Sequence, residues 1–231
     1  MRAPFDINKT LYADNPCWLF KKIIDPWTPP IAKFLYNIGL SANILTLISF
    51  VLGISGIAAM VLFRNYWGLV IAAVLITMRT LGDALDGKIA RGSGTATPFG
   101  GFLDIIVDWL FFHAAFFIAI GYITGHIWLG FLCVTGYMSR EFARTKFTKS
   151  YGVKVTETGE AKKIGGIVSL LKKYDIAGVT LLSPILLLLN QAVWIIIIVA
   201  IVEYTLMLGE LAFDFRLLWK LKQQGQPGQQ K

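Results

Sequence analysis

Long apolar runs separated by short polar turns dominate the pattern of hydrophobic and polar residues along this chain. A membrane-spanning helix needs about 20 consecutive, mostly apolar residues. The runs predict an all-α, polytopic membrane protein with six transmembrane helices, of which the fifth is the shortest. These helices are expected over 43–63, from 67 into the Asp83 region, and over 101–123, 127–147, 176–189 and 193–213.

Residues 1–40 follow a different pattern, in which aromatic residues are interleaved with lysines. Such a mixture suits the headgroup layer, where amphipathic helices lie in the plane of the membrane. We expect an N-terminal amphipathic interfacial helix interrupted by the prolines at 26, 29 and 30. The chain 1–231 is then a single membrane-embedded catalytic domain, with the interfacial segment at 1–40, a six-helix core at 41–215 and a polar tail at 216–231 that is disordered from Lys220.

Composition separates the chain from soluble proteins. Charged residues make up 16% of its 231 residues, against about 25% in soluble domains. The net charge of +8 favours an anionic membrane face or a phosphorylated substrate over nucleic acid, because the basic residues cluster in loops such as 148–175. Cys17 and Cys133 form no CxxC pair, so neither a disulfide framework nor a zinc site is expected.

Basic residues are divided unequally between the two sets of loops. Of the 22 lysines and arginines, only Arg64 falls in the turns on the side opposite the termini. Loops rich in positive charge stay in the cytoplasm. Both termini and the region around Asp83 are therefore predicted to be cytoplasmic, in a multi-pass protein of the cell membrane.

Four aspartates lie inside or at the edge of the second and third apolar runs: Asp83, Asp86, Asp104 and Asp108. Ionisable groups at membrane depth are costly and usually functional. Spacings of three and four residues put each pair on one face of a helix. The segment RGSGTATPFGG between the pairs predicts a turn, and so a helical hairpin in which the two pairs face each other.

Four carboxylates that converge in a low-dielectric site need cations between them. Oxygen ligands suit Mg²⁺, Mn²⁺ or Ca²⁺, and four are enough for two ions about 4 Å apart, an arrangement that clamps a phosphoryl group. Gly87 and Ala90 are small enough for a substrate to approach the backbone, and Arg91 could hold a phosphate in a bidentate fork.

The same residues resemble the signature of the CDP-alcohol phosphotransferase (CDP-alcohol phosphatidyltransferase) family, which reads here Asp83-x2-Asp86-Gly87-x2-Ala90-Arg91-x8-Gly100-x3-Asp104-x3-Asp108. Every fixed position of the signature is present. The segment SANILTL is similar to the family's opening of the first span, with Ala42 where proline is common and with Asn43 and Thr46 in place. The six predicted spans and the interfacial helix also resemble the family.

The resemblance implies an integral membrane enzyme of phospholipid biosynthesis, in which an alcohol hydroxyl attacks a CDP-linked donor and CMP leaves. It implies two divalent cations, Mg²⁺ or Mn²⁺, held by Asp83, Asp86, Asp104 and Asp108. Asp108 would also act as the general base. The resemblance further implies a homodimer and a set of residues that border the CDP, namely Gly87, Ala90, Arg91, Asn43 and Thr46.

A second polar cluster lies at the end of the fourth predicted span. Arg140 and Arg144 are four residues apart and project together, with Lys146 close by. The segment TGYMSREFART is loosely similar to a family segment that binds an acceptor's phosphate, and ordinary flanking charge is the equal alternative. The first interpretation predicts a polyol phosphate, inositol phosphate or glycerol 3-phosphate as acceptor, and the second a neutral alcohol or serine.

Three other polar residues carry weaker expectations. His113 lies five positions beyond Asp108, so it is expected to be a core histidine that does not face the site. Glu203 and Glu210 are seven residues apart and share a helix face. They are expected to line the cavity, or to pair with a neighbouring helix or a dimer mate.

The leading interpretation is the transfer of a phosphatidyl-type group from a CDP-diacylglycerol-like lipid to a polar alcohol. In one alternative the lipid and soluble substrates exchange roles: a soluble CDP-alcohol is the donor, and a lipid such as diacylglycerol is the acceptor. An alternative from another class is a cation transporter that uses the aspartates as an ion pathway. Transport is disfavoured because no comparable density of carboxylates continues across the membrane.

Overall fold

The computed structural model describes residues 4–10, 18–151 and 176–223, and the elements in these ranges are all helical, which confirms the predicted fold class. In chain order they are η1 (Ile7–Thr10), α1 (Trp18–Ile23), α2 (Thr28–Asn37), α3 (Ala42–Phe63), α4 (Tyr66–Ser93), α5 (Pro98–Ile105), the π-helical η2 (Ile106–His113), α6 (Ala114–Ile123), α7 (Ile127–Tyr151), α9 (Ile176–Leu188) and α10 (Ala192–Gln223).

Four stretches of the described residues are long and apolar enough to cross a membrane: α3, α4, the continuous stretch Pro98–Ile123, and Ala192–Ala212 of α10. They correspond to the predicted first, second, third and sixth spans. The predicted fourth and fifth spans correspond to α7 and α9. The four stretches identify a multi-pass membrane protein. Because α9 has only 13 residues and α7 carries several charged residues in its second half, the count of six spans stays a prediction.

Side-chain caps define the hairpin that carries the aspartates. α4 ends at Gly94, whose φ of 69° lies in the left-handed region that favours glycine. α5 begins after Thr97, whose hydroxyl accepts a hydrogen bond from the Gly100 amide at 3.0 Å. Ser41 caps α3, and its hydroxyl accepts from the Ile44 amide at 3.4 Å. The turn between α4 and α5 reverses the chain, so the aspartates of the third span face α4.

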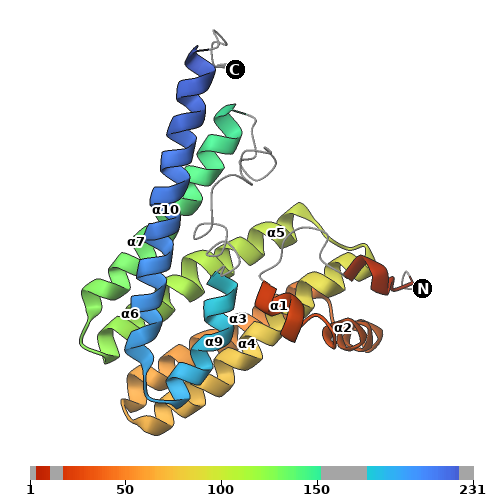
Figure 1. Ribbon diagram of the computed structural model, residues 1–231. Coiled ribbons are helices and arrows are strands. Elements are labelled where there is room, and N and C mark those ends of the chain that lie inside the picture. The colour runs from red at the N-terminus through yellow and green to blue at the C-terminus, as the bar shows by residue number, and fades with distance from the viewer. Residues whose placement is uncertain (1–3, 11–17, 152–175, 224–231) are drawn as a thin grey trace.

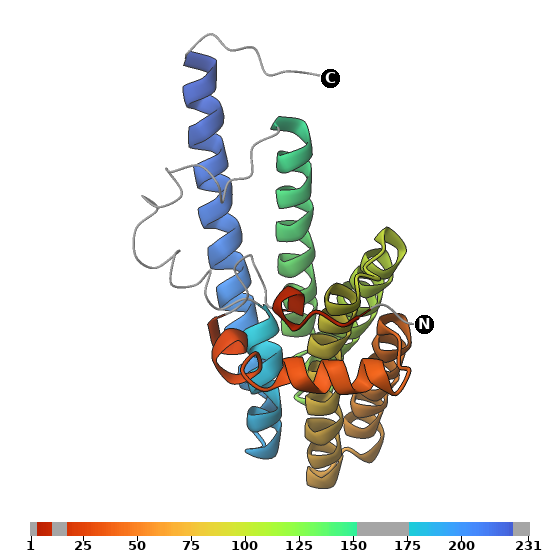
Figure 2. The ribbon, with the colours of Figure 1, turned by 90° about the vertical axis from the view of Figure 1, so that its right-hand side faces the viewer.

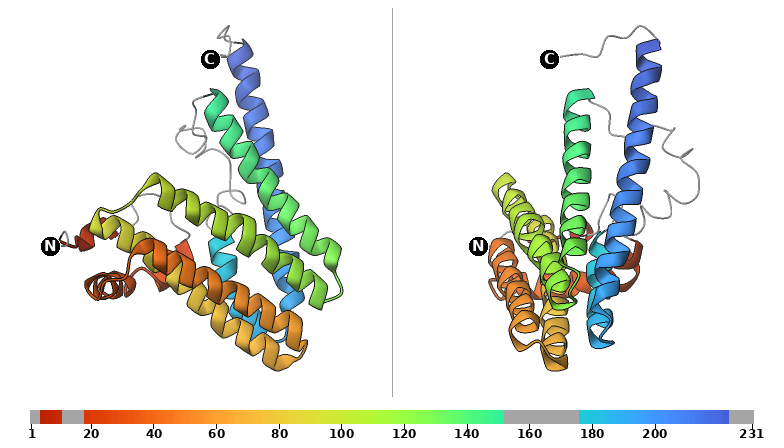
Figure 3. Two further views of the ribbon diagram at one scale, coloured as in Figure 1. Left: turned by 180° about the vertical axis from the view of Figure 1, so that it is seen from behind. Right: turned by 90° about the vertical axis from the view of Figure 1, so that its left-hand side faces the viewer.

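Small residues let the helices approach one another closely. α3 and α4 form an antiparallel pair (Figure 1), and the stretch from α5 to α6 lies against α3 (Figure 3). A Cβ built on Gly130 of α7 would lie 2.6 Å from the Phe117 carbonyl oxygen of α6, so only glycine fits there. The main core draws on α3, α4, η2, α6, α7, α9 and α10, and includes the buried side chains of Met60, Ile76, Phe112, Phe116, Leu187 and Ile195.

The described part of the N-terminal segment contains η1, α1 and α2, and the prediction that prolines 29 and 30 interrupt a helix is wrong. These prolines lie in the first turn of α2, where a backbone N–H has no helical partner to lose. The break lies at 24–27 and includes Pro26. Within this break Asp25 pairs with Lys88 of α4, with 2.5 Å between Oδ1 and Nζ, and Lys88 is fully buried. The N-terminal segment is thereby fastened to α4.

α7 and α10 pack against each other and extend beyond the ends of the other helices (Figure 2). α10 continues to Gln223, so the disorder predicted from Lys220 is wrong for the first residues of the tail. α7 continues to Tyr151, and the rest of the predicted basic loop, like the end of the tail, lies outside the described residues. Cys133 is a buried free thiol, and Cys17 also lies outside the described residues.

Candidate functional site

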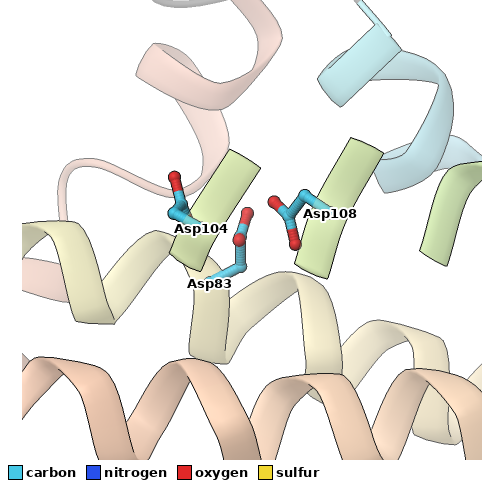
Figure 4. Close-up of side chains that lie close together, drawn as sticks. All are labelled: Asp83, Asp104 and Asp108. Atoms are coloured by element: carbon cyan, nitrogen blue, oxygen red, sulfur yellow. The ribbon is translucent and has the colours of Figure 1, made fainter. Parts of the chain in front are cut away.

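Three of the four predicted aspartates converge at the hairpin. Asp83 comes from α4, Asp104 from α5 and Asp108 from η2, and their carboxylates point toward one another (Figure 4). One carboxylate oxygen of each lies within 4.8 Å of the others, and all three side chains are half-buried. Segments separated by the 94–97 turn therefore supply one compact acidic cluster.

The chemistry of this cluster fits a metal ion. Each of the three residues offers a carboxylate oxygen, the ligand type that hard divalent cations prefer. Carboxylates held this close in a half-buried site repel one another unless positive charge lies between them. The aspartate cluster, defined here as Asp83, Asp104 and Asp108, is thus a group that could hold a metal.

Asp86 lies beside the aspartate cluster and faces α3. Its Oδ2 accepts a hydrogen bond from the Thr46 hydroxyl at 2.6 Å, and its side chain is buried. Residues three apart on an α-helix differ in direction by about 60°, which turns Asp86 away from Asp83 and toward the helix that carries Thr46. The role of Asp86 as a metal ligand stays a prediction, and its hydrogen bond joins it to Thr46, a residue predicted to border the CDP group.

Arg79 is a site residue that the sequence analysis missed. Its guanidinium forms an ion pair with Asp108 and lies 3.6 Å from Asp83 Oδ1, and only 3% of its side chain is exposed. The guanidinium also stacks over the Phe112 ring, 4.2 Å from the centroid. Arg79 precedes Asp83 by one helical turn, the i,i+4 spacing of paired side chains, and this spacing was the signal that could have found it. A fixed cation therefore offsets part of the cluster's negative charge.

The residues predicted to border a CDP group surround the same end of α4. A Cβ built on Gly87 would lie 3.1 Å from Nη1 of Arg91, so the glycine leaves room for the guanidinium. The Ala90 carbonyl accepts from the Thr95 amide at 3.0 Å and so forms part of the turn that ends α4. Asn43 lies across from this turn, with its Oδ1 3.1 Å from a Cβ built on Gly100.

A cavity of about 400 Å³ opens at this end of the molecule. It lies between the start of α3, the end of α4 and the cap of α5. Its lining includes Tyr36, Ser41, Asn43, Ile89, Thr95 and Thr97. Of the residues predicted to border CDP, Asn43 lines this cavity. The volume falls in the range of small-molecule sites.

Of the three predicted acceptor residues, Arg140 is the one whose side chain the structure describes. Arg140 forms a buried ion pair between α7 and α10, with 2.7 Å from its Nη1 to Glu203 Oε2 and 3.6 Å from its Nε to Glu210 Oε2. The glutamates therefore pair with a neighbouring helix, which is one of the three predicted outcomes. Arg144 and Lys146 lie in α7, but their side chains are outside the described part of the chain. An acceptor-binding role for these three basic residues stays a prediction.

His113 is a buried core histidine, as predicted, and is 5% exposed. Its Nδ1 donates a hydrogen bond to the Asp108 carbonyl at 2.7 Å, and its Nε2 lies 3.3 Å from Thr180 Oγ1. The α-helical spacing that placed His113 away from Asp108 does not apply, because Ile106–His113 is π-helical. In a π-helix residues five apart are hydrogen-bonded neighbours.

The fold and the aspartate cluster define a multi-pass membrane protein with an acidic, metal-type site at a helical hairpin. Residues 40–208 match the model of the CDP-alcohol phosphatidyltransferases, and the chain belongs to this family. The family resemblance of the sequence is thereby confirmed, and with it the assignment to membrane enzymes of the phosphotransferase class.

Curated relatives match shorter stretches. The archaetidylinositol phosphate synthase of Aeropyrum pernix is 36% identical over 94 residues, which are 39% of this chain and 46% of the relative. The enzyme of the same name from Pyrococcus horikoshii is 33% identical over 78 residues, 34% of this chain and 39% of the relative. The phosphatidylinositol phosphate synthase of Mycolicibacterium smegmatis is 37% identical over 82 residues, 34% of each chain. The matched stretches thus span less than half the length of these relatives.

Proposed function

We propose that this protein transfers a phosphatidyl-type group from a CDP-linked lipid to a hydroxyl of an inositol phosphate and releases CMP. The observation that carries the proposal is the convergence of Asp83, Asp104 and Asp108 within the stretch that matches the family. The choice of acceptor follows the names of the archaeal and bacterial relatives, each a synthase of an inositol phosphate lipid.

Two divalent cations, Mg²⁺ or Mn²⁺, would be held by the aspartate cluster together with Asp86. When bound, they would neutralise the donor's pyrophosphate and the charge that develops on the leaving CMP. Asp86 approaches from the α3 side, where the Thr46 hydroxyl fixes the orientation of its carboxylate. All four aspartates then act on one pyrophosphate, as the family signature implies.

Asp108 is the proposed general base. The acceptor hydroxyl oxygen attacks the phosphorus attached to the lipid, the bond from that phosphorus to the CMP oxygen breaks, and the hydroxyl proton passes to the Asp108 carboxylate. Arg79 holds this carboxylate in place through its ion pair. The phosphodiester product keeps the lipid, and CMP carries away the pair of electrons from the broken bond.

The CDP part of the donor is proposed to lie between α3 and the end of α4. Asn43 and Thr46 would approach it from α3, and Gly87, Ala90 and Arg91 from α4. Gly87 leaves space beside the Arg91 guanidinium, so a phosphate could reach that cation without meeting a side chain. The 400 Å³ cavity next to Asn43 has room for the nucleoside.

The proposed setting is the cytoplasmic edge of the membrane, with both termini in the cytoplasm and with two copies of the chain forming a homodimer. The basic bias of the loops on the side of the termini supports this orientation. The acyl or alkyl chains of the donor would stay in lipid while the CDP and the acceptor enter from the cytosol. Arg140, Arg144 and Lys146 are the candidates for binding the acceptor's phosphate.

The test is CMP release by the purified protein in nanodiscs with Mg²⁺, CDP-diacylglycerol or its archaeal ether counterpart, and a panel of acceptors. Inositol phosphate is expected to give the highest rate, ahead of inositol, glycerol 3-phosphate and serine. Asp108→Asn should abolish release and leave donor binding measurable. The proposal would be contradicted if no acceptor gave CMP release, or if Asp108→Asn left the release unchanged. Transfer from CDP-choline to diacylglycerol would favour the alternative with a soluble CDP-alcohol donor and a lipid acceptor.

A further inference from the structure

The segment that carries Asp108 has a backbone unlike the rest of the third span. Ile106–His113 is π-helical, whereas α5 before it and α6 after it are α-helical. π-helical turns are rare, are less well packed than α-helical turns and occur often at functional sites. Such a turn needs support from its surroundings to persist. The contacts of His113 supply that support at Asp108.

His113 connects the backbone of Asp108 to another helix. A carbonyl oxygen can only accept, so the ring proton lies on Nδ1, which donates to the Asp108 carbonyl at 2.7 Å. Nε2 is then left to accept from the hydroxyl of Thr180 in α9, 3.3 Å away. Thr180 is itself held by α9, because its carbonyl accepts from the Ser183 hydroxyl at 2.9 Å. The partner of each ring nitrogen thus fixes the tautomer.

The ring is also fixed by packing. His113 lies 5.7 Å from the Tyr137 ring of α7 and 6.2 Å from the Phe117 ring of α6, measured between centroids. Both His113 and Thr180 are buried, with 5% and 3% exposed. A ring held by two hydrogen bonds and packed against aromatic neighbours resists a shift, and a shift would move the peptide that it binds.

We propose that His113 and Thr180 form a positioning pair that sets the place of the Asp108 carboxylate in the aspartate cluster. The pair acts on the backbone end of Asp108, while Arg79 holds its carboxylate end. An aspartate has one methylene between backbone and carboxylate, so a rotation of its peptide moves the carboxylate almost directly. The inference rests on the proposed function of Asp108. It also gives α9 a part in the site, although Thr180 lies far along the sequence from Asp108, the last residue of the family signature.

The aspartate cluster gives such a shift a large effect. Its three carboxylate oxygens are all within 4.8 Å of one another, so a displacement on the order of 1 Å changes the separation of two ligand atoms appreciably. A misplacement of that size at a reacting group costs about 100-fold in rate. Losing one neutral hydrogen bond of the pair, with the packing retained, is expected to cost less, about 3- to 10-fold.

The two residues offer matched substitutions. Thr180→Val keeps the shape and removes the hydroxyl, and Thr180→Ser keeps the hydroxyl. His113→Asn keeps a donor at the place of Nδ1 and loses the link to Thr180, whereas His113→Gln places its amide nearer Thr180 and loses the bond to the Asp108 carbonyl. Thr205→Val, which removes a hydroxyl that bonds the Ile201 carbonyl of its own helix, is the control for a lost membrane-helix hydroxyl.

Two measurements test the pair. The first is kcat and donor KM for CMP release in nanodiscs, where Thr180→Val should lower kcat about 3- to 10-fold with little change in KM. Thr180→Ser should recover most of the rate, and His113→Asn should retain more activity than His113→Gln. The second measurement, Mn²⁺ affinity by electron paramagnetic resonance, needs no turnover. It should weaken severalfold in Thr180→Val and His113→Gln, and stay unchanged in Thr205→Val.

The outcomes separate this proposal from the proposed function. A wild-type protein that binds Mn²⁺ but releases no CMP would contradict the function, and the Mn²⁺ affinities would still test the positioning pair. Wild-type kcat and Mn²⁺ affinity in both Thr180→Val and His113→Gln would overturn the pair. Equal losses of kcat in His113→Asn and His113→Gln would also overturn the pair, since a purely structural role does not depend on which ring nitrogen is imitated. Equal losses of kcat in Thr180→Ser and Thr180→Val would overturn it as well.

Discussion

Arg79 offers the sharpest test of how the site balances its charges. Arg79→Met keeps much of the volume of the side chain and removes the guanidinium that pairs with Asp108 and lies 3.6 Å from Asp83 Oδ1. At that distance two unit charges attract by about 4–5 kcal/mol at an effective dielectric constant near 20. Removing one member of a buried ion pair costs about 3–5 kcal/mol in practice, because the remaining charge is left uncompensated.

The loss of stability should depend on Mg²⁺. Without divalent cations, Arg79→Met is expected to lower the free energy of unfolding by about 3 kcal/mol or more. With Mg²⁺ the loss should shrink to the extent that the variant binds the ion more tightly than the wild type, by about 1.4 kcal/mol for each tenfold difference in Kd at saturating Mg²⁺. Arg79→Met should also bind Mg²⁺ more tightly than the wild type, since the neighbouring positive charge that repels the ion is gone.

The assay is unfolding in mixed micelles with and without Mg²⁺, followed by circular dichroism. Lys33→Met, which removes an exposed positive charge from α2, is the control and should change stability little in either condition. An equal loss of stability in Arg79→Met with and without Mg²⁺ would refute the charge balance described here. Unchanged stability in both conditions would show that the ion pair contributes nothing.

Three further predictions follow from other contacts. Thr46→Val removes the hydroxyl bonded to Asp86 and should slow CMP release about tenfold, while Thr46→Ser should keep most of the rate. A normal rate in Thr46→Val would count against a role for this bond. Lys88→Met should destabilise the protein by about 3–5 kcal/mol because Asp25 stays buried without its partner. Adding Asp25→Leu should recover much of that loss in unfolding experiments, and no recovery would contradict the ion pair. Chelation of divalent cations should abolish CMP release and added Mg²⁺ should restore it, whereas release that persists in chelator would exclude a metal requirement.

The spans and the aspartate hairpin were accessible from sequence because both depend on local patterns. α3 begins at Ala42 and ends at Phe63, within one residue of the prediction. The segment RGSGTATPFGG and the helical spacing of the aspartates were sufficient to predict a hairpin in which the two aspartate pairs face each other, and the structure brings Asp83, Asp104 and Asp108 together there. Each of these inferences used residues within about one helical hairpin of one another.

Contacts between distant segments were not accessible in the same way. Lys88 and Asp25 are 63 positions apart, as are Arg140 and Glu203. A periodicity argument shows which face a charge occupies, but not which helix covers that face. Arg79 was missed for a related reason, since it was counted with the basic residues of the loops and helix ends, although it lies buried at the aspartate cluster.

The π-helical segment shows a different limit. The spacing of Asp104 and Asp108 fits an α-helix, and the local sequence IVDWLFFH contains no glycine or proline that would mark a change of helix type. The segment also has partners outside the hairpin, among them Thr180 of α9, whose Oγ1 lies 3.3 Å from His113 Nε2. The direction in which His113 points therefore followed from tertiary contacts and not from its position in the sequence.

The ion pair between Asp25 and Lys88 has a consequence for where the membrane surface lies. Lys88 sits between Asp86 and Arg91 on α4, so the break between α1 and α2 is tied to the same turn of helix that carries the site. Phe34 of α2 and Ile38 just after it are exposed by 62% and 65%. Apolar side chains of an interfacial helix settle at the boundary of headgroups and acyl chains. With α2 in its predicted place at the membrane interface, this ion pair would set the depth of the carboxylates relative to the lipid headgroups.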